Sequence, residues 1–558
     1  MKIPRILVAA GAGLALADAS VVTLALPELI VELDTTVEGV AAVLAVYTLV
    51  LAAALIPAER FRLRVGSRFL GVWGFIVFAA AGAGCGVVDS LAPLLVLRGA
   101  QALGAAAGLV CGFDFLTAGE RSRERLWTAA VVLGAAVGPA LGGLLTELFD
   151  WRAIFLVQAP IGVLAALAFL DRGEATIPLG SQNGARGEPR RAYQGIELGP
   201  AIALALVSAA LSAVLFLLVL LLVSGWSISP LEAALAVTIL PVAALVGMRI
   251  TGEPRLRAAA GCGLVGAGIL ALASLGSASV AWIVLPQLMA GLGMGLALTS
   301  LIGPLLPEQT PGQTAVLLAI RHAGITLALL LLAPITAAQI DDAVADTRER
   351  GAALVLDAEL PPLDKIELAN AVTADLDPVD PRGTLSESLD ASGESVGDDP
   401  EGAAVYADLA RHADETLVAG IDEAFSLAFL VTGALALLGA LAVLARRDPR
   451  TLRLSLVVVG SALVLSACQA AIAVSARPDP VVIADPCQGR DLPGTGGIGG
   501  FVQDAALVGL DRAACEFGSS REELAIALVD DEAAQSYEAE HGVDPRAIDE
   551  LARGALGF

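Results

Sequence analysis

Long apolar stretches separated by short polar segments repeat along most of the chain. A hydrocarbon core about 30 Å thick needs roughly 20 apolar residues in each crossing helix. The stretches that meet this requirement predict thirteen spans, at residues 5–27, 38–57, 68–88, 91–117, 126–148, 151–170, 198–224, 231–250, 258–276, 280–306, 312–340, 420–445 and 453–475. The pattern therefore predicts an all-α integral membrane protein.

Composition agrees with this pattern and excludes several functions. Hydrophobic residues make up 56% of the 558 residues and charged residues 16%, whereas soluble domains carry about 25% charged residues. The net charge of −24 gathers in two polar segments, because residues 341–420 hold 20 acids and 5 bases, and residues 476–558 hold 16 acids and 6 bases. Such acidity argues against a nucleic-acid partner. The sequence contains no phosphate-binding loop that would indicate ATP-driven transport, and no group of residues that would indicate a catalytic site.

The basic residues predict how the chain crosses the membrane. Short loops retained in the cytoplasm are rich in Lys and Arg. With a cytoplasmic N-terminus in a plasma membrane, the inner segments receive nearly all of these residues, and the short outer loops carry none except Arg152. Both acidic segments then lie outside, and the C-terminal tail is extracytoplasmic.

These assignments divide the chain into seven parts. We expect a six-helix bundle (1–170), a cytoplasmic linker (171–197), helices seven to eleven of a second bundle (198–340), an acidic extracytoplasmic loop that is partly disordered or a loose cap (341–419), a twelfth helix (420–446), an extra helix (453–475) and a small helical tail domain (476–558). In the tail, Ser520 with Glu523 forms a capping-box pattern that predicts a helix start.

Two of the charged residues inside predicted spans form a candidate pair. A charge there costs at least about 2.5–3.5 kcal/mol, so it faces a cavity or a partner. Asp18 lies in the first span, and Arg98 lies in the fourth, with Gln101 on the same helix face. The residues are candidates for proton coupling or for the substrate cavity, with Asp18 as the partner of Arg98. The alternative is a structural pair that only fixes helix packing.

Three further features have two interpretations each. Small residues recur every fourth position in the fifth span around Pro139, which predicts either a bent gate or ordinary close packing. Arg321 either lines a cavity or marks the inner surface, and His322 beside it could titrate near neutral pH. Asp114 is as easily a snorkelling charge as a functional one. We expect no metal site, because the chain holds only three His.

The six cysteines fall into three groups. Cys85, Cys111 and Cys262 lie in predicted spans, where inert buried thiols are expected. Cys487 and Cys515 lie in the outer tail, where an oxidising compartment favours a disulfide. Cys468 ends the sequence "LSAC" (465–468), which is similar to a lipoprotein signal. A plain thirteenth span is the alternative interpretation of that segment.

Several motifs together resemble the drug:proton antiporters of the major facilitator superfamily, in the branch usually built with fourteen helices. "ADASVVTLALP" (17–27) is similar to the signature of the first helix, and "RGAQALG" (98–104) to a proton-transfer motif in the fourth. "GAAVGPALGG" (134–143) is similar to the antiporter motif of the fifth helix, and "RHAG" (321–324) to a segment of the second half. The antiporter motif comprises Gly134, Gly138, Pro139, Gly142 and Gly143.

The loop between the second and third helices departs from the family pattern. In "ERFRLRVGSR" (59–68), Arg64, Gly66 and Arg68 match, but Glu59 replaces a Gly and Leu63 replaces the Asp of the inner gate. The two extra central helices of the fourteen-helix branch are also missing.

The resemblance implies a secondary active transporter without a cofactor, which exports a small amphipathic drug or metabolite by alternating access. Its partners would be the solute, protons and the bilayer, and a proton gradient would drive export. The altered inner loop keeps a second hypothesis open: a non-transporting, transporter-like receptor or scaffold that binds a partner through its acidic outer segments.

Overall fold

In the computed structural model the described residues form helices joined by short turns. They comprise 3–117, 124–170, 196–306, 310–360, 365, 368, 380–396, 400–445, 449–478, 481–490, 492–493 and 497–547. The expected linker at 171–197 falls almost wholly outside this range. Regular secondary structure within the described range is helical.

The described residues of the first half of the bundle form seven helices. They are α1 (Ile3–Thr23), α2 (Leu26–Glu32), α3 (Val37–Val65), α4 (Ser67–Cys85), α5 (Leu91–Thr117), α6 (Glu124–Leu148) and α7 (Trp151–Ala168). Polar caps fix two of the starts, since the Thr36 side chain accepts from Gly39 N and that of Asp150 from Ala153 N. Apolar side chains of α1 and α3–α7 form a buried cluster, which also takes in Ala315, Leu318 and Ala319 of α13 from the second half.

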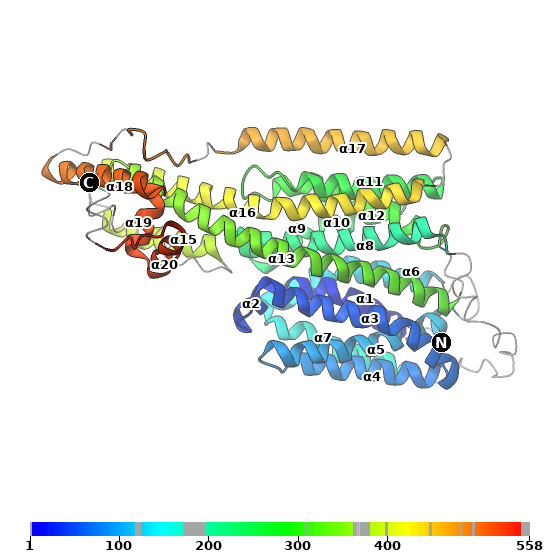
Figure 1. The fold of residues 1–558 in the computed structure, drawn as a ribbon. Coiled ribbons are helices and arrows are strands. Elements are labelled where there is room, and N and C mark those ends of the chain that lie inside the picture. The colour runs from blue at the N-terminus through cyan, green and yellow to red at the C-terminus, as the bar shows by residue number, and fades with distance from the viewer. Residues whose placement is uncertain are drawn as a thin grey trace.

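The second half is also built from packed helices. Its helices are α8 (Leu198–Val219) with the π-helical turn η3 (Leu220–Gly225), α9 (Pro230–Val237), α10 (Ile239–Gly247), α11 (Pro254–Ala271), α12 (Ala281–Leu301), α13 (Pro311–Asp357) and α16 (Pro400–Leu444). Outside this half lie α15 (Pro381–Val396) and α17 (Pro449–Ala476). The two halves lie side by side (Figure 1), and they meet where α3 packs on α13, α6 on α9, and α1 on α8.

The predicted spans all fall on helices. Eleven helical segments in the described part of the chain are long and apolar enough to cross a membrane. The two remaining predicted spans correspond to α6 and α11, which pack within the same bundle. Helix breaks subdivide two spans, because α1 gives way to α2 and α9 to α10. The prediction of an all-α membrane protein is confirmed.

Helices α13 and α16 extend far beyond the predicted spans. They contain 47 and 45 residues, which corresponds to about 70 Å each at 1.5 Å per residue, against a hydrocarbon core of about 30 Å. Both extend past the same end of the bundle (Figure 1). We call their parts between residues 341 and 419, together with α15, the cap. Apolar residues from all three helices form its core, including Val355, Leu389 and Leu417.

The C-terminal tail forms a small helical domain on the cap. It contains α18 (Gly497–Phe517), α19 (Arg521–Val529) and α20 (Asp531–His541) around a core that includes Leu524 and Tyr537. Ser520 Oγ accepts from Glu523 N at 2.9 Å, so the predicted helix start is confirmed. Ion pairs of 2.6 Å between Arg348 and Asp530 and between Arg521 and Asp357 join the tail domain to the end of α13.

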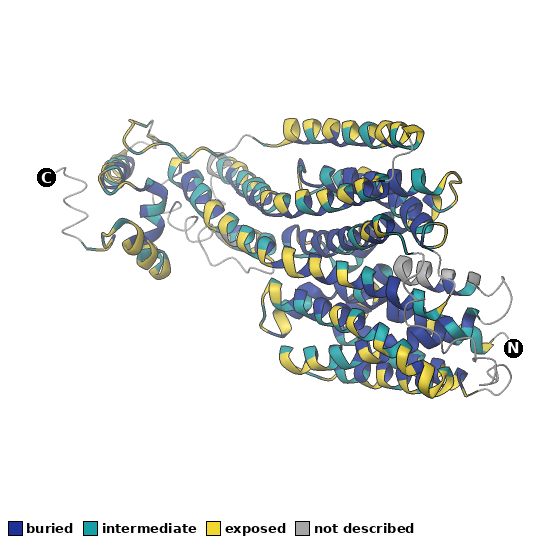
Figure 2. Ribbon diagram, turned by 45° about the vertical axis from the view of Figure 1, so that its right-hand side comes forward, coloured by how far each residue is buried: buried dark blue, intermediate teal, exposed yellow. Residues whose placement is uncertain are grey.

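Helix α17 lies along the outside of the second half, against α11. Most of its surface is exposed (Figure 2). Its inner face carries the anchoring bonds: Ser466 donates to Ala267 O at 2.6 Å and Gln469 to Trp282 O at 2.9 Å. Cys468 lies between these residues in a continuous helix, with its side chain exposed.

Candidate functional site

A buried ion pair lies at the centre of the first half. Arg98 of α5 places a guanidinium nitrogen 2.6 Å from a carboxylate oxygen of Asp18 on α1, and both side chains are 0% exposed. Removing two charges from water is costly, and their mutual attraction repays that cost only with good geometry and further hydrogen bonds. A charge pair at this depth is therefore a candidate functional element.

Two glutamines complete the hydrogen bonding of the pair. Gln101 accepts from Arg98 at 2.8 Å and donates to Gln158 Oε1 at 3.0 Å. Gln158 of α7 in turn donates to Asp18 Oδ1 at 3.0 Å. Neither amide is more than 1% exposed. Asp18, Arg98, Gln101 and Gln158 thus form a closed network from three helices, which we call the buried network.

Aromatic rings enclose the guanidinium. The guanidinium carbon Cζ of Arg98 lies 4.4 Å from the centre of the Tyr47 ring and 5.5 Å from that of the Phe155 ring, within the range of cation–π attraction. Tyr47 is fixed in turn, since its hydroxyl donates to Ala15 O at 2.8 Å. Gln158 and Phe155 were not named as site residues from the sequence. A polar Gln within an otherwise apolar span was the available signal.

A cavity of about 60 Å³ lies between the two halves beside this network. Tyr47, Ser20 and Pro139 line it from the first half, and Arg321 and His322 line it from α13. Tyr47 therefore contacts both the cavity and the guanidinium of Arg98. Arg321 lies on the cavity and not in the buried network. We call this space the central cavity.

The glycines of α6 allow close approach on two sides. A Cβ at Gly138 would lie 2.0 Å from Ser20 Oγ, and one at Gly142 only 2.3 Å from Val21 O, so both face α1. A Cβ at Gly143 would lie 2.3 Å from Ala234 of α9, in the other half. The motif thus packs α6 against both halves at once. Gly134 is on α6, but its surroundings lie outside the described residues.

The predicted loop at 59–68 is helical except at Gly66, because α3 ends at Val65 and α4 begins at Ser67. This segment, which joins α3 to α4, holds a cluster of charged and polar groups. Arg62 binds Glu59 at 2.7 Å and Asp114 of α5 at 3.1 Å, and Ser67 donates to the same Asp114 carboxylate. Glu59, which replaces the family's glycine, is therefore one of three side-chain partners of Arg62 in the described part of the chain, together with Asp114 and Ser67. The motif residue Leu63 is exposed.

The three site residues predicted in this segment, Arg64, Gly66 and Arg68, lie in different surroundings. Arg64 is exposed. Gly66 has a φ of +88°, which favours glycine. Arg68 donates to Leu170 O at 2.8 Å and thereby ties the loop to the end of the first half.

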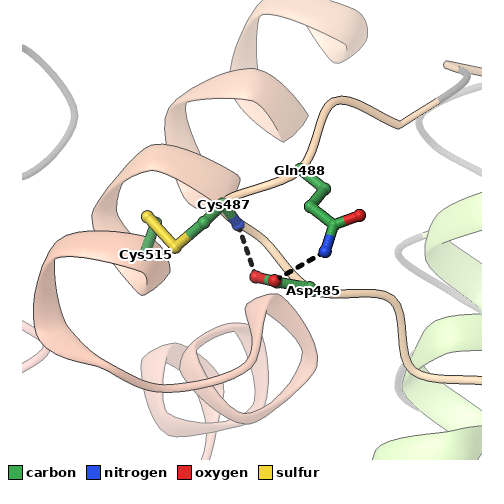
Figure 3. Close-up of a disulfide and its surroundings, with 4 residues drawn as sticks. All are labelled: Asp485, Cys487, Gln488 and Cys515. Carbon is green, nitrogen blue, oxygen red and sulfur yellow. Dashed lines mark hydrogen bonds between the residues drawn. A yellow bond between two sulfur atoms is a disulfide. The ribbon is translucent and has the colours of Figure 1, made fainter.

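The tail domain contains the disulfide-forming cysteines. Cys487 and Cys515 are bonded across a sequence separation of 28, and Asp485 accepts from the Cys487 N–H (Figure 3). One set of possible metal ligands also gathers in the described part of this domain, formed by Glu523, Glu540 and His541. His541 Nε2 lies 2.9 Å from Glu523 Oε1, so a hydrogen bond accounts for that contact.

Three comparisons identify related sequences. A model described as "Major Facilitator Superfamily" matches residues 8–338. The multidrug resistance protein Stp of Mycobacterium tuberculosis is 36% identical over 166 residues, which is 28% of this chain and 31% of Stp. The methylenomycin A resistance protein of Bacillus subtilis is 32% identical over 169 residues, or 29% of this chain and 36% of that protein. These alignments cover about a third of each relative's length.

A similar fold occurs among solved structures. A bacterial homologue of the human lysosomal transporter Spinster, in an inward-facing and unoccupied conformation, superposes with a TM-score of 0.50. It is 16% identical, and the superposition covers 80% of this chain and 100% of that one. At this identity the likeness shows the fold alone. Because the family model matches more than half of the sequence, this chain belongs to the Major Facilitator Superfamily.

Proposed function

We propose that this protein is a proton-coupled exporter of a small amphipathic molecule, working by alternating access. The observation that carries the proposal is the buried network, in which Asp18 is the one carboxylate among the described groups that contact Arg98. Relatives that match part of the chain are named for drug resistance or efflux, such as Stp and the drug efflux pump JefA of Mycobacterium tuberculosis.

Asp18 is the proposed proton acceptor. Protonation of its carboxylate would remove the charge opposite Arg98, and a buried cation left without its partner is strongly destabilising. Arg98 would then move toward other acceptors, and the Tyr47 ring on which it stacks would shift with it. Since Tyr47 also lines the central cavity, the protonation state of Asp18 would affect solute binding there.

The contacts between the halves are the proposed gates. Thr326 of α13 donates to Thr48 of α3 at 2.9 Å, and Gly143 of α6 packs directly on α9. Alternating access requires such contacts to open on one side while others close. Pro139 lies between Gly138 and Gly142 and removes one backbone hydrogen bond, which favours a bend at the cavity.

The orientation belongs to the same proposal. The loop between α3 and α4 would face the cytoplasm together with the N-terminus, and the cap and tail domain would be extracytoplasmic. Protons taken up from outside would drive outward release of the solute. Helix α17 would be an additional span beyond the two six-helix halves.

Ethidium export from cells under an imposed pH gradient tests this function. The Asp18→Asn variant removes the titrating group and keeps the shape of the side chain, so gradient-driven export is expected to be lost. Asp34→Asn is the matched control, because it makes the same change at an exposed residue outside the spans, in a left-handed conformation that Asn also accepts. Full export by Asp18→Asn at normal expression would refute the proposal.

One observation favours the second candidate, a transporter-like receptor. The tail domain contains its own charged core, where Arg490 binds Glu522 at 2.8 Å, and it is docked on the cap by ion pairs. A built domain of this kind would suit partner binding. Absence of any gradient-driven flux by the wild-type protein in proteoliposomes would favour this candidate over the exporter.

A further inference from the structure

A second cavity, of about 230 Å³, lies between the halves at the end that bears the cap. Its walls are almost wholly hydrocarbon, from residues such as Leu220, Ile340, Leu417 and Phe425. We call it the apolar pocket. Pockets for complete drug-sized ligands measure about 300–1,000 Å³. The apolar pocket therefore has room for a segment of a molecule.

The pocket is bounded by both halves and by the cap. Ile30 and Val37 contribute from the first half, η3, α13 and α16 from the second, and Pro381 from α15. The next residue, Arg382, binds Asp414 of α16 at 2.6 and 2.9 Å and donates to Trp226 O at 3.2 Å. The cap is thus fastened over the pocket. Most of the lining lies beyond residue 338, outside the part of the chain that matches the family model.

The π-helical turn η3 shapes one wall. Such turns are rare and occur often at functional sites. Ser224 of this turn lines the pocket, and its buried hydroxyl oxygen has no hydrogen-bond partner among the described residues. An unpaired buried hydroxyl costs free energy, so its presence in an apolar wall indicates that a polar atom of a ligand could reach it. Gly225 lets Ile421 approach, because a Cβ there would lie 2.8 Å from it.

The apolar pocket and the central cavity follow one another along α8. Leu215 of α8 lines the central cavity and Leu220, the first residue of η3, lines the apolar pocket. The two residues are five positions apart, or about 7.5 Å along the helix. The central cavity carries Ser, Tyr, His and Arg side chains, whereas the apolar pocket carries mostly aliphatic ones. A solute leaving the central cavity toward the cap would meet first polar and then apolar surroundings.

We propose that the apolar pocket binds the hydrocarbon chain of a single-chain amphiphile during export. The exported solute would then be lipid-like, with a polar head and one extended chain, and the cap would shield that chain from water. This inference rests on the proposed export function and specifies its substrate class. The occupant follows from the hydrocarbon walls, the size of the pocket and its place on the seam between the halves.

Photolabelling of the full-length protein in nanodiscs tests the proposal. The probe is hexadecyl phosphocholine with a diazirine at the chain end, and labelled residues are mapped by mass spectrometry. Leu427 and Leu430 of α16 are exposed on the outer face, so bulk lipid-like probe labels them and provides an internal reference. Labelling of the pocket residues of α13 and α16 is expected above that reference.

Two variants and a competition series sharpen the test. Ala343→Phe fills the pocket and is expected to abolish pocket labelling, whereas Leu427→Phe, on the outer face of α16, is expected to preserve it. With the wild-type protein, unlabelled alkyl phosphocholines from octyl to hexadecyl are tested for competition with the probe for labelling of the pocket. Their potency is expected to rise about fourfold per methylene until the pocket is full, and then to level off.

The outcomes separate this inference from the proposed function. A potency that keeps rising with chain length, or pocket labelling that Ala343→Phe leaves unchanged, overturns the proposed occupant even if ethidium export proceeds. Pocket labelling that behaves as expected, together with no gradient-driven export, supports the occupant and overturns the export function alone.

Discussion

Replacing Gly142 of α6 by Ala tests whether the glycine motif is needed for contact between α6 and α1. The added Cβ would lie 2.3 Å from Val21 O and 3.3 Å from Leu24 Cβ. Contacts below 3.0 Å force a neighbour to move, and here the neighbour is helix backbone. Helix α1 would therefore have to shift, and α1 carries Asp18.

The expected cost follows from two opposing terms. Overpacking a well-filled site costs about 1–3 kcal/mol, and Ala is favoured over Gly in a helix by about 1 kcal/mol. Gly99 of α5 provides the matched control, because its Cβ would lie 3.9 Å from Val46 and Val50, in ordinary contact. The preference of a helix for Ala over Gly is the same in both variants and cancels in the comparison. Gly142→Ala should therefore be less stable than Gly99→Ala by about 1–3 kcal/mol, the cost of overpacking.

Thermal denaturation of the detergent-solubilised protein, followed by size-exclusion chromatography, measures this difference. Gly142→Ala is expected to aggregate at a lower temperature than the wild type, and Gly99→Ala at the same or a higher one. Equal midpoints for the two variants would refute the close approach of α6 to α1.

Three further predictions use the same preparation. Arg62→Gln should destabilise the folded protein by about 1–3 kcal/mol more than Arg64→Gln, because Arg62 pairs with Glu59 and Asp114 whereas Arg64 is exposed. Equal thermal midpoints for these two variants would contradict this. The pair Cys487→Ser and Cys515→Ser should destabilise the tail domain by about 3–4 kcal/mol for a loop of this length, and unchanged resistance of the tail to limited proteolysis would refute that figure. Burial, with the nearby Glu32 and Asp150 carboxylates, raises the pKa of Glu28 from 4.5 to about 7. Between these two pH values the folded protein binds a proton that the unfolded protein has released, so the stabilisation from this group is lost as pH rises from 4.5 to 7. The Glu28→Gln variant should therefore show a smaller pH dependence of the thermal midpoint over that range than the wild type.

The sequence predicted the membrane helices well, because apolar runs of about twenty residues seldom occur outside membrane spans. It missed the length of α13 and α16. Their outer turns carry Asp346, Arg348 and Asp408, which lower hydropathy and resemble a loop. The signal that could have shown helix was the spacing of Leu409, Ala413 and Leu417, which places them on one face toward the cap core.

The site was predicted in part. A buried Arg needs a partner, so Arg98 and Asp18 could be matched from sequence, and the structure places them in contact. Gln158 comes from a third helix, and nothing in the spacing of residues shows which distant helices meet. The apolar pocket was not predictable, because apolar residues that line a cavity look the same in sequence as those that fill a core.

Substrate exchange and gradient-driven accumulation, compared in proteoliposomes containing the Asp18→Asn variant, test the central claim most directly. If Asp18 couples protons to transport, the variant should still exchange ethidium across the membrane without a gradient but should no longer accumulate it when a pH gradient is imposed. Accumulation at the wild-type level would contradict the account, because the buried carboxylate would then have no part in coupling.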